Sequence, residues 1–245
     1  MQQPSSAHQR SVSPRHPRLL VVAPTRRELG GLRPGAAGAS HVALVRVGHE
    51  AGPALRQLLA SSRPGLVVSA GYAGGLNPRA GTGDIAVCSA VMDGHGAAVA
   101  LDAGLVETTM RALSTRPGGY ERGTLLTVES PLLSAREKWE ARARFDADVV
   151  DMEAHALAEA CAAAGVPMLA LRAVLDEAHH DLPEFVAAIV ADGGGNEWRH
   201  VGRTLARDPL AARRLPALAW RSRVASAALR RALRVVLPAL EGALT

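Results

Sequence analysis

The sequence is short of cysteine, aromatic residues and lysine. Of its 245 residues two are cysteine, two phenylalanine and two tyrosine. Cys88 and Cys161 both lie inside apolar segments, which excludes a disulfide framework and indicates a reduced, cytoplasmic protein. So few aromatic rings leave no set of stacking platforms for nucleic acid, so we expect no nucleic-acid partner.

Long apolar runs are also missing. No run reaches the roughly 18 residues that a membrane-spanning helix needs, and the N-terminal segment lacks the apolar core of a signal peptide. The sequence therefore predicts a cytoplasmic location, with peripheral contact at the inner face of the membrane as the alternative. The length is sufficient for one domain with a sizeable core.

Acidic residues are scarce at the two ends of the chain. Residues 1–18 hold three arginines and no acid, and residues 199–245 hold ten arginines against two acids. Such ends suit phospholipid headgroups or nucleic acid. They also suit a solvated helical surface in an arginine-rich chain, because Lys138 is the only lysine. Both interpretations remain open.

Strand and helix patterns alternate through most of the chain. Residues 1–18 are rich in Pro and Ser and are predicted to be disordered. The remainder divides into a catalytic domain at 19–185 and a basic helical extension at 186–245. Strands are predicted at 19–23, 41–47, 65–69, 83–88, 123–128 and 168–175, and helices at 48–60, 105–113, 134–144 and 152–164. This alternation favours an α/β fold with a parallel or mixed sheet.

The segment from Val149 to Asp176 is the most informative. Its helix is expected to end at Gly165, where a left-handed conformation is cheapest for glycine. The apolar run that follows is typical of a strand covered on both faces. Glu153 and Asp176 bracket this unit, and sites in α/β sheets lie beyond the carboxyl ends of strands.

A glycine-rich stretch, Gly71-Tyr72-Ala73-Gly74-Gly75, follows a predicted strand. We interpret it as a strand-to-helix turn whose glycines let the backbone approach a ligand. It matches neither a phosphate-binding Walker loop nor a dinucleotide fingerprint. A tight turn without any ligand is the simpler alternative.

Four motifs occur in a diagnostic order. They are SAGYAGGLNPRAGTGDIAV at 69–87, TVES at 127–130, VDMEA at 150–154 and RAVLD at 172–176. Together they resemble the superfamily of purine nucleoside phosphorylases and methylthioadenosine/adenosylhomocysteine nucleosidases, over residues 19–178. The resemblance implies a three-layer α/β/α fold with a central mixed sheet, a purine nucleoside substrate, a homo-oligomer and no cofactor.

Two further stretches narrow the resemblance. DEAHHDLP at 176–183, followed by an arginine-rich end, is similar to the hopanoid-associated phosphorylase branch. That branch is implied to release adenine from adenosylhopane, a lipid-linked nucleoside. VAPTRREL at 22–29 is similar to futalosine hydrolases. A methylthioadenosine/adenosylhomocysteine or futalosine hydrolase is therefore the main alternative, and a noncatalytic, membrane-associated nucleoside-binding protein is the alternative from another class.

The resemblance also implies roles for individual residues. Asp176 would protonate N7 of the purine, Glu153 would bind the ribose hydroxyls and Glu28 would activate the attacking water. Met152 would pack beneath the sugar. The other implied substrate contacts are Gly71, Tyr72, Ala73 and Gly74 along the glycine stretch, and Ser130, Pro131 and Leu132 against the base.

Each carboxylate has a simpler explanation. Glu153 could favour a helix dipole, Asp176 could cap a helix at 177–185, and Glu28 could be a solvated acid in a first turn. His179 and His180 are adjacent, so we expect them to point apart and to bind no metal.

The nucleophile is water or phosphate. Arg26 or Arg27 would hold a phosphate, but Ser69 stands where phosphorylases of this superfamily place a second arginine. A phosphate dianion needs charged partners, so the sequence favours water. Leu175 departs from the Ser or Thr that relatives often carry before the acid.

Overall fold

The computed structural model describes residues 19–25, 28–29, 41–44, 51–115, 118–187, 213 and 215–243. The predicted disordered tail, Arg26, Arg27 and the loop at 192–196 lie outside these residues. Within them, no helix is long and apolar enough to cross a bilayer.

One mixed sheet of eight strands forms the centre of the molecule. Its strands are β1 (Leu19–Ala23), β2 (His41–Leu44), β3 (Leu66–Gly75), β4 (Ile85–Met92), β5 (Ala98–Ala100), β6 (Tyr120–Thr127), β7 (Val149–Asp151) and β8 (Met168–Asp176). The order is β2-β1-β3-β7-β6-β4-β5, and β8 pairs with both β3 and β4. The pairings β3–β8–β4–β6–β7 and back to β3 therefore close a ring.

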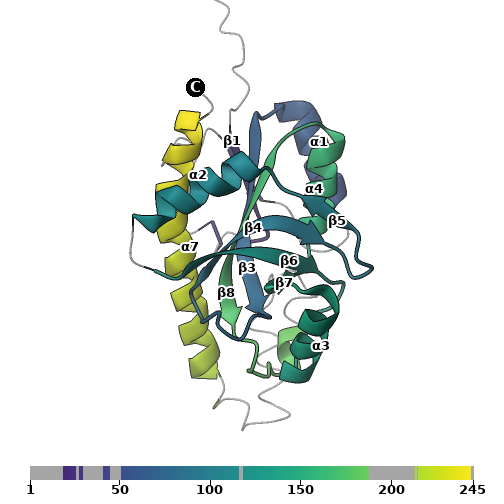
Figure 1. The fold of residues 1–245 in the computed structure, drawn as a ribbon, viewed down its shortest axis with the longest axis vertical. Helices are drawn as coiled ribbons and strands as arrows, with labels where there is room; N and C mark the ends of the chain where they lie inside the picture. The colour runs from purple at the N-terminus through teal and green to yellow at the C-terminus, as the bar shows by residue number, and fades with distance from the viewer. Residues whose placement is uncertain are drawn as a thin grey trace, which may run out of the picture.

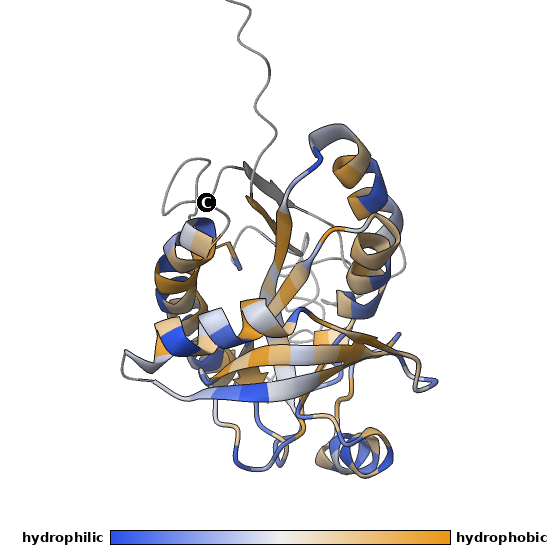
Figure 2. Ribbon diagram, turned by 45° about the horizontal axis from the view of Figure 1, so that its top comes forward, coloured by the Kyte–Doolittle hydropathy of each residue, from blue (hydrophilic) through white to orange (hydrophobic). Residues whose placement is uncertain are grey.

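Helices cover the sheet on two sides, which gives the expected α/β/α layers (Figure 1). The helices α1 (Ala51–Ser62) and α4 (Ala154–Ala163) pack together on one side, and α2 (Ala103–Ser114) and α7 (Leu215–Ala243) on the other. In Figure 2 the strands between them are mainly in hydrophobic colours. Each side has its own apolar cluster, one built with Leu55 and Leu157 and the other with Leu229 and Leu233. The three-layer fold predicted from the resemblance is confirmed.

Local sequence signals set several element ends. The helix α3 (Ala135–Phe145) begins with a capping box, in which Ser134 and Glu137 satisfy each other's backbone N–H groups. Gly165 follows α4 with a φ of 65°, the left-handed conformation expected at a helix end.

The glycine-rich stretch is a strand, not a turn. Residues 71–75 continue β3, pairing parallel with β8 and, at Gly74 and Gly75, antiparallel with β7. Glycine is unfavourable in strands on its own account, but close neighbours on both sides leave little room for a side chain here. A Cβ at Gly74 would lie 3.1 Å from a methyl group of Val150. The prediction of a strand-to-helix turn was wrong, because these residues pair with β7 and β8. The short strand β5 was not predicted.

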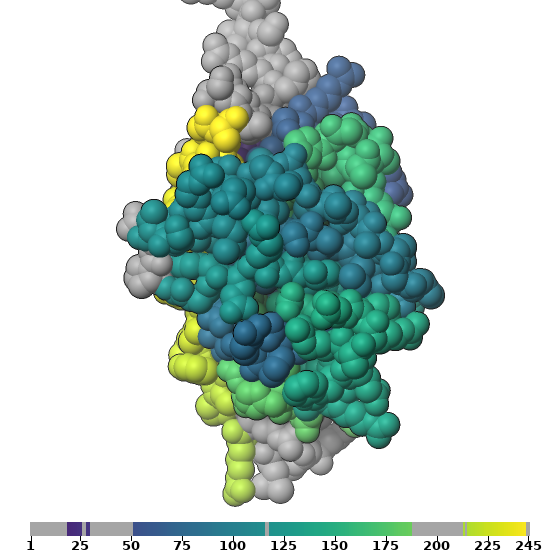
Figure 3. Space-filling view, in the orientation of Figure 1, coloured from purple at the N-terminus to yellow at the C-terminus, as the bar shows by residue number. Residues whose placement is uncertain are grey.

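The long C-terminal helix α7 runs along one side of the molecule (Figure 3). Arg223, Arg230 and Arg234 are exposed on this helix, and Leu229, Leu233, Val236 and Leu240 are buried. Pro238 lies inside α7, which continues past it to Ala243. Pro216 lies in the first turn, where a missing N–H costs nothing.

Candidate active site

Three acidic residues lie along the carboxyl-terminal part of β3. Glu28 follows β1, Asp176 ends β8, and Glu153 lies at the start of α4. Because β1 and β8 both run parallel to β3, the carboxyl ends of these three strands lie at the same edge of the sheet. This edge is where ligands bind in open α/β sheets.

The carboxylate of Glu28 is buried and accepts three hydrogen bonds, two from Thr25 and one from Tyr72. Oε2 accepts from the Thr25 amide at 2.8 Å and hydroxyl at 2.7 Å, and Oε1 accepts from the Tyr72 amide at 3.1 Å. Burial raises the pKa of Glu28, although these hydrogen bonds and Arg172 act in the opposite direction. The alternative of a solvated first-turn acid is excluded, because Glu28 is only 6% exposed.

Glu153 lies beside Glu28 across Gly71. A Cβ added at Gly71 would lie 3.2 Å from Glu28 Oε1 and 3.5 Å from Glu153 Oε1. Burial and the neighbouring Asp151 raise the pKa of Glu153 well above its usual value, while Arg172 lowers it and Glu28 raises it. Glu153 is the N-cap residue of α4, yet its side chain makes no capping hydrogen bond. Its carboxylate is therefore available to a ligand.

Arg172 belongs to the RAVLD motif, but the sequence assigned it no role. It is fully buried, and its nitrogens donate to Asp151 and to the carbonyl and hydroxyl oxygens of Ser69. Nη2 also lies 3.6 Å from Glu153 Oε1. The guanidinium thus links β8 to Asp151 of β7 and to Ser69 of β3, and its charge partly neutralises Glu153.

Asp176 is buried at the end of β8, opposite Gly74. A Cβ at Gly74 would lie 3.6 Å from both of its carboxyl oxygens. Lys138 Nζ of α3 donates to Oδ2 at 2.5 Å. Burial raises the pKa of Asp176 more than the ammonium of Lys138 lowers it. Asp176 caps no helix, because a hydrogen-bonded turn follows it, with the His180 amide donating to Glu177 O.

The site therefore has two ends along β3. Glu28 and Glu153 lie at Gly71, and Asp176 lies at Gly74. These two positions are three residues apart, a rise of about 10 Å along the strand. Two carboxyl groups at the sugar end can bind hydroxyls and activate water, and one protonated carboxyl at the other end can serve as an acid.

The remaining predicted contacts divide into two groups. Tyr72 and Met152 lie at the site, Tyr72 through its amide on Glu28 and Met152 through its amide, which donates to Glu153 Oε2 at 3.3 Å. Ala73 follows Tyr72 in β3 and is buried. In the segment after β6, Ser130 is exposed, Pro131 is half-buried and Leu132 packs against an apolar cluster with Leu76, Leu126, Ala147 and Val150.

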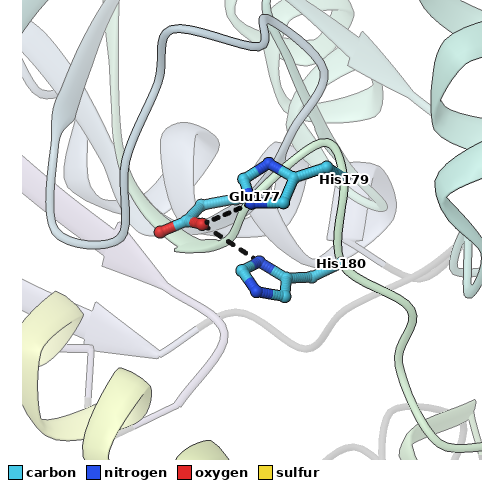
Figure 4. Close-up of side chains that lie close together, drawn as sticks. All are labelled: Glu177, His179 and His180. Carbon is cyan, nitrogen blue, oxygen red and sulfur yellow. Dashed lines mark ion pairs between the residues drawn. The ribbon is translucent and has the colours of Figure 1, made fainter.

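His179 and His180 point toward the same carboxylate (Figure 4). His179 Nε2 and His180 Nδ1 lie 3.3 and 3.0 Å from Glu177 Oε2. The expectation that they point apart was wrong, because residues 177–180 form a turn and not a helix or strand. We assign the cluster no metal, since Glu177 Oε1 already accepts two hydrogen bonds from Thr82 and the positive charge of Arg221 acts on His180.

A separate hollow of about 480 Å³ lies at the opposite end of β8, near Met168. Its lining is largely apolar, with Val99, Cys161 and Val166. It contains none of the three carboxylates, which lie near the carboxyl ends of β1, β3 and β8.

Comparison with known proteins identifies similar molecules. A 5′-methylthioadenosine/S-adenosylhomocysteine nucleosidase of Bacillus subtilis is 30% identical over 151 residues, which cover 53% of this chain and 65% of that protein. The chain thus spans less than two thirds of the length of this curated relative.

Solved structures of low sequence identity share the fold. The methylthioadenosine/adenosylhomocysteine nucleosidase of Neisseria meningitidis aligns with a TM-score of 0.63 and 20% identity, over 89% of this chain and 97% of that one. A futalosine hydrolase mutant of Helicobacter pylori aligns with a TM-score of 0.60 and 15% identity, over 77% and 98%. The sequence pattern of the phosphorylase superfamily matches residues 30–197, more than half of the chain. The chain therefore belongs to the phosphorylase superfamily.

Proposed function

We propose that the protein cleaves the N-glycosidic bond of a purine nucleoside, with adenosylhopane as its substrate and adenine as the released base. The observation that carries this proposal is the arrangement of three buried carboxyl groups along one strand, Glu28 and Glu153 at Gly71 and Asp176 at Gly74. The similarity to nucleosidases supports the reaction class.

The mechanism follows from the charges that develop as the bond breaks. The ribose becomes positive, and Glu153 stabilises it through its hydroxyl groups. The purine takes the electron pair of the glycosidic bond, and Asp176 transfers its proton to N7. Glu28, fixed by Thr25 and Tyr72, accepts the proton of the attacking water.

Water is the proposed nucleophile. Ser69, at the position of the phosphate-binding arginine in phosphorylases of the superfamily, is buried, and its hydroxyl accepts a hydrogen bond from Arg172. Arg172 itself is neutralised by Asp151. Arg26 and Arg27, the predicted phosphate ligands, lie outside the described residues.

The exposed side of α7 also supports a lipid-linked substrate. Arg223, Arg230, Arg231 and Arg234 are exposed there, and Trp220 is 59% exposed. Basic side chains with an aromatic anchor favour the surface of an anionic membrane. The substrate could then be reached from the bilayer without a membrane-spanning helix.

The test is a substrate panel. Purified protein is incubated with adenosylhopane in anionic vesicles, methylthioadenosine, adenosylhomocysteine and futalosine, with and without phosphate, and free base is quantified by chromatography. We expect adenine from adenosylhopane at a rate that does not depend on phosphate. Preferential cleavage of another substrate would support the alternative hydrolases, and phosphate dependence would replace hydrolysis by phosphorolysis. Binding of all substrates without release of base would indicate a noncatalytic protein.

A further inference from the structure

Lys138 is the only lysine of the chain and is fully buried. It is also the single buried residue of α3. A lysine is almost never fully buried unless it is paired, because removal of its charge from water is costly. The position of Lys138 therefore depends on its partners.

Those partners use all the hydrogen-bonding capacity of the ammonium group. An ammonium has three N–H donors. Nζ donates to Asp176 Oδ2 at 2.5 Å, to the Glu177 carbonyl at 3.1 Å and to the His180 carbonyl at 2.7 Å. No hydrogen bond to Asp176 Oδ1 occurs among the described residues, so this oxygen is available to a ligand.

Two further contacts fix α3 to the segment that follows Asp176. The amide of Ala135 donates to Asp181 Oδ1 at 2.8 Å, and the amide of Leu182 donates to the Leu133 carbonyl at 2.6 Å. The start of α3 and residues 176–182 thus form one hydrogen-bonded unit. The orientation of the Asp176 carboxyl group depends on this unit through Lys138.

The charges around Asp176 act in opposite directions. Burial raises its pKa, whereas Lys138 is the largest of the groups that lower it, ahead of Arg221 of α7 and His180. The adjacent Glu177 is directed to Thr82, His179 and His180. Burial therefore favours the protonated acid at rest, and Lys138 favours the carboxylate that remains after proton transfer.

We propose that Lys138 is a positioning residue for the reaction: it holds Oδ2 of Asp176 so that the other oxygen meets the purine, and its charge stabilises the carboxylate formed when the proton leaves. This inference rests on the proposed function. In the step, the O–H bond of Asp176 breaks, the N7–H bond forms, and the electron pair of the glycosidic bond moves to the purine. Lys138 keeps its proton throughout.

The test compares Lys138→Gln, which removes the charge, with Lys138→Arg, which retains it. Trp139→Ala is the matched control, because Trp139 is an exposed residue of the same helix. For Lys138→Gln we expect kcat to fall by about 100-fold, at the low end of the contribution of a positioned acid, with KM nearly unchanged. The alkaline limit of the pH profile, where Asp176 loses its proton, should move up by about one pH unit because an opposite charge has been removed. Lys138→Arg should lower kcat through altered geometry and leave this limit in place.

Other results would overturn the assignment. An equal loss of activity at every pH, with the alkaline limit unmoved in Lys138→Gln, would indicate a purely structural role. If the glutamine variant does not fold, the arginine variant decides. A shifted alkaline limit in Lys138→Arg would also overturn the assignment, because this variant retains the positive charge. The titration of Asp176, followed by ¹³C NMR of protein labelled at Asp, gives a reading without turnover. An inactive wild type overturns the proposed function, whereas an Asp176 that titrates alike in the wild type and in Lys138→Gln overturns the role of Lys138.

Discussion

Arg172 and Asp151 form a fully buried ion pair in which two guanidinium nitrogens share one carboxylate oxygen, at 3.0 Å from Nε and 2.7 Å from Nη2. The same arginine also forms an ion pair with Glu153, at 3.6 Å from Nη2 to Oε1. One cation thus serves two buried acids, one structural and one at the ligand-binding edge. We therefore expect the loss of Arg172 to act first on the free energy of unfolding and only second on catalysis.

Replacement of this arginine gives the first prediction. Arg172→Met should lower the free energy of unfolding by about 3–5 kcal/mol, because it leaves Asp151 buried without its partner. Unfolding in urea measures the change. The double variant Arg172→Met/Asp151→Asn should recover part of the loss, since it contains no lone charge. A loss below about 1 kcal/mol, typical of an exposed ion pair, would contradict the pairing.

The acid assignment predicts that Asp176→Asn abolishes release of adenine while the protein remains folded. An amide has no acidic proton to transfer to the base. Chromatographic detection of adenine and a thermal melt of the same sample measure activity and fold together. Activity equal to that of the wild type would exclude Asp176 as the acid.

Glu153 should destabilise the folded protein at neutral pH. Because its pKa is raised on folding, the folded state binds more protons than the unfolded state between the two pKa values. Stability therefore falls as pH rises through that window, and the full loss remains above the folded pKa. Glu153→Gln should raise stability at neutral pH by about 1 kcal/mol, with a gain that disappears below the unfolded pKa, and should lower activity. Unfolding curves at several pH values test the sign, and a gain that grows in acid would contradict it.

The space at Gly71 gives a steric prediction. Gly71→Ala would place a methyl group among Glu28, Glu153 and Arg172, in the region proposed for the sugar and the water. We expect activity to fall by about 100-fold, as a misplacement of about 1 Å can produce. Gly94→Ala is the control, because nothing lies within 4 Å of a Cβ at that position. Equal activity in the two variants would show that Gly71 lies away from the reacting groups.

The exposed arginines of α7 predict binding to anionic vesicles. Changing Arg223, Arg230 and Arg234 together to Glu should weaken this binding by about 100-fold or more, since each basic residue near such a surface contributes about 1 kcal/mol. Co-sedimentation with phosphatidylserine vesicles measures it. The same change at the exposed Arg56, Arg79 and Arg111 is the control for net charge. Equal losses of vesicle binding in both variants would mean that net charge, and not the surface of α7, determines this binding.

The sequence predicted what depends on local pattern and order along the chain. Glu153 at a helix start and Asp176 at a strand end were predicted in this way, as was the helix end at Gly165. The strand at Gly71–Gly75 was missed, because pairing with β7 and β8 outweighs the low strand preference of glycine. Lys138 lies 38 residues from Asp176, and its composition signal, a single lysine, was attributed to arginine enrichment. The role of Arg172 depends on burial and on partners from β3 and β7, which no local pattern shows.

The packing of α7 has a practical consequence for fragment design. Nine of its residues are buried, and the Tyr72 hydroxyl lies 2.6 Å from Ser226 Oγ while the Tyr72 amide holds Glu28. A fragment trimmed before Leu215 to remove the arginine-rich end would uncover one face of the sheet and release the residue that orients Glu28. We expect such a fragment to aggregate during expression, so recombinant work on the catalytic centre requires the chain through Ala243.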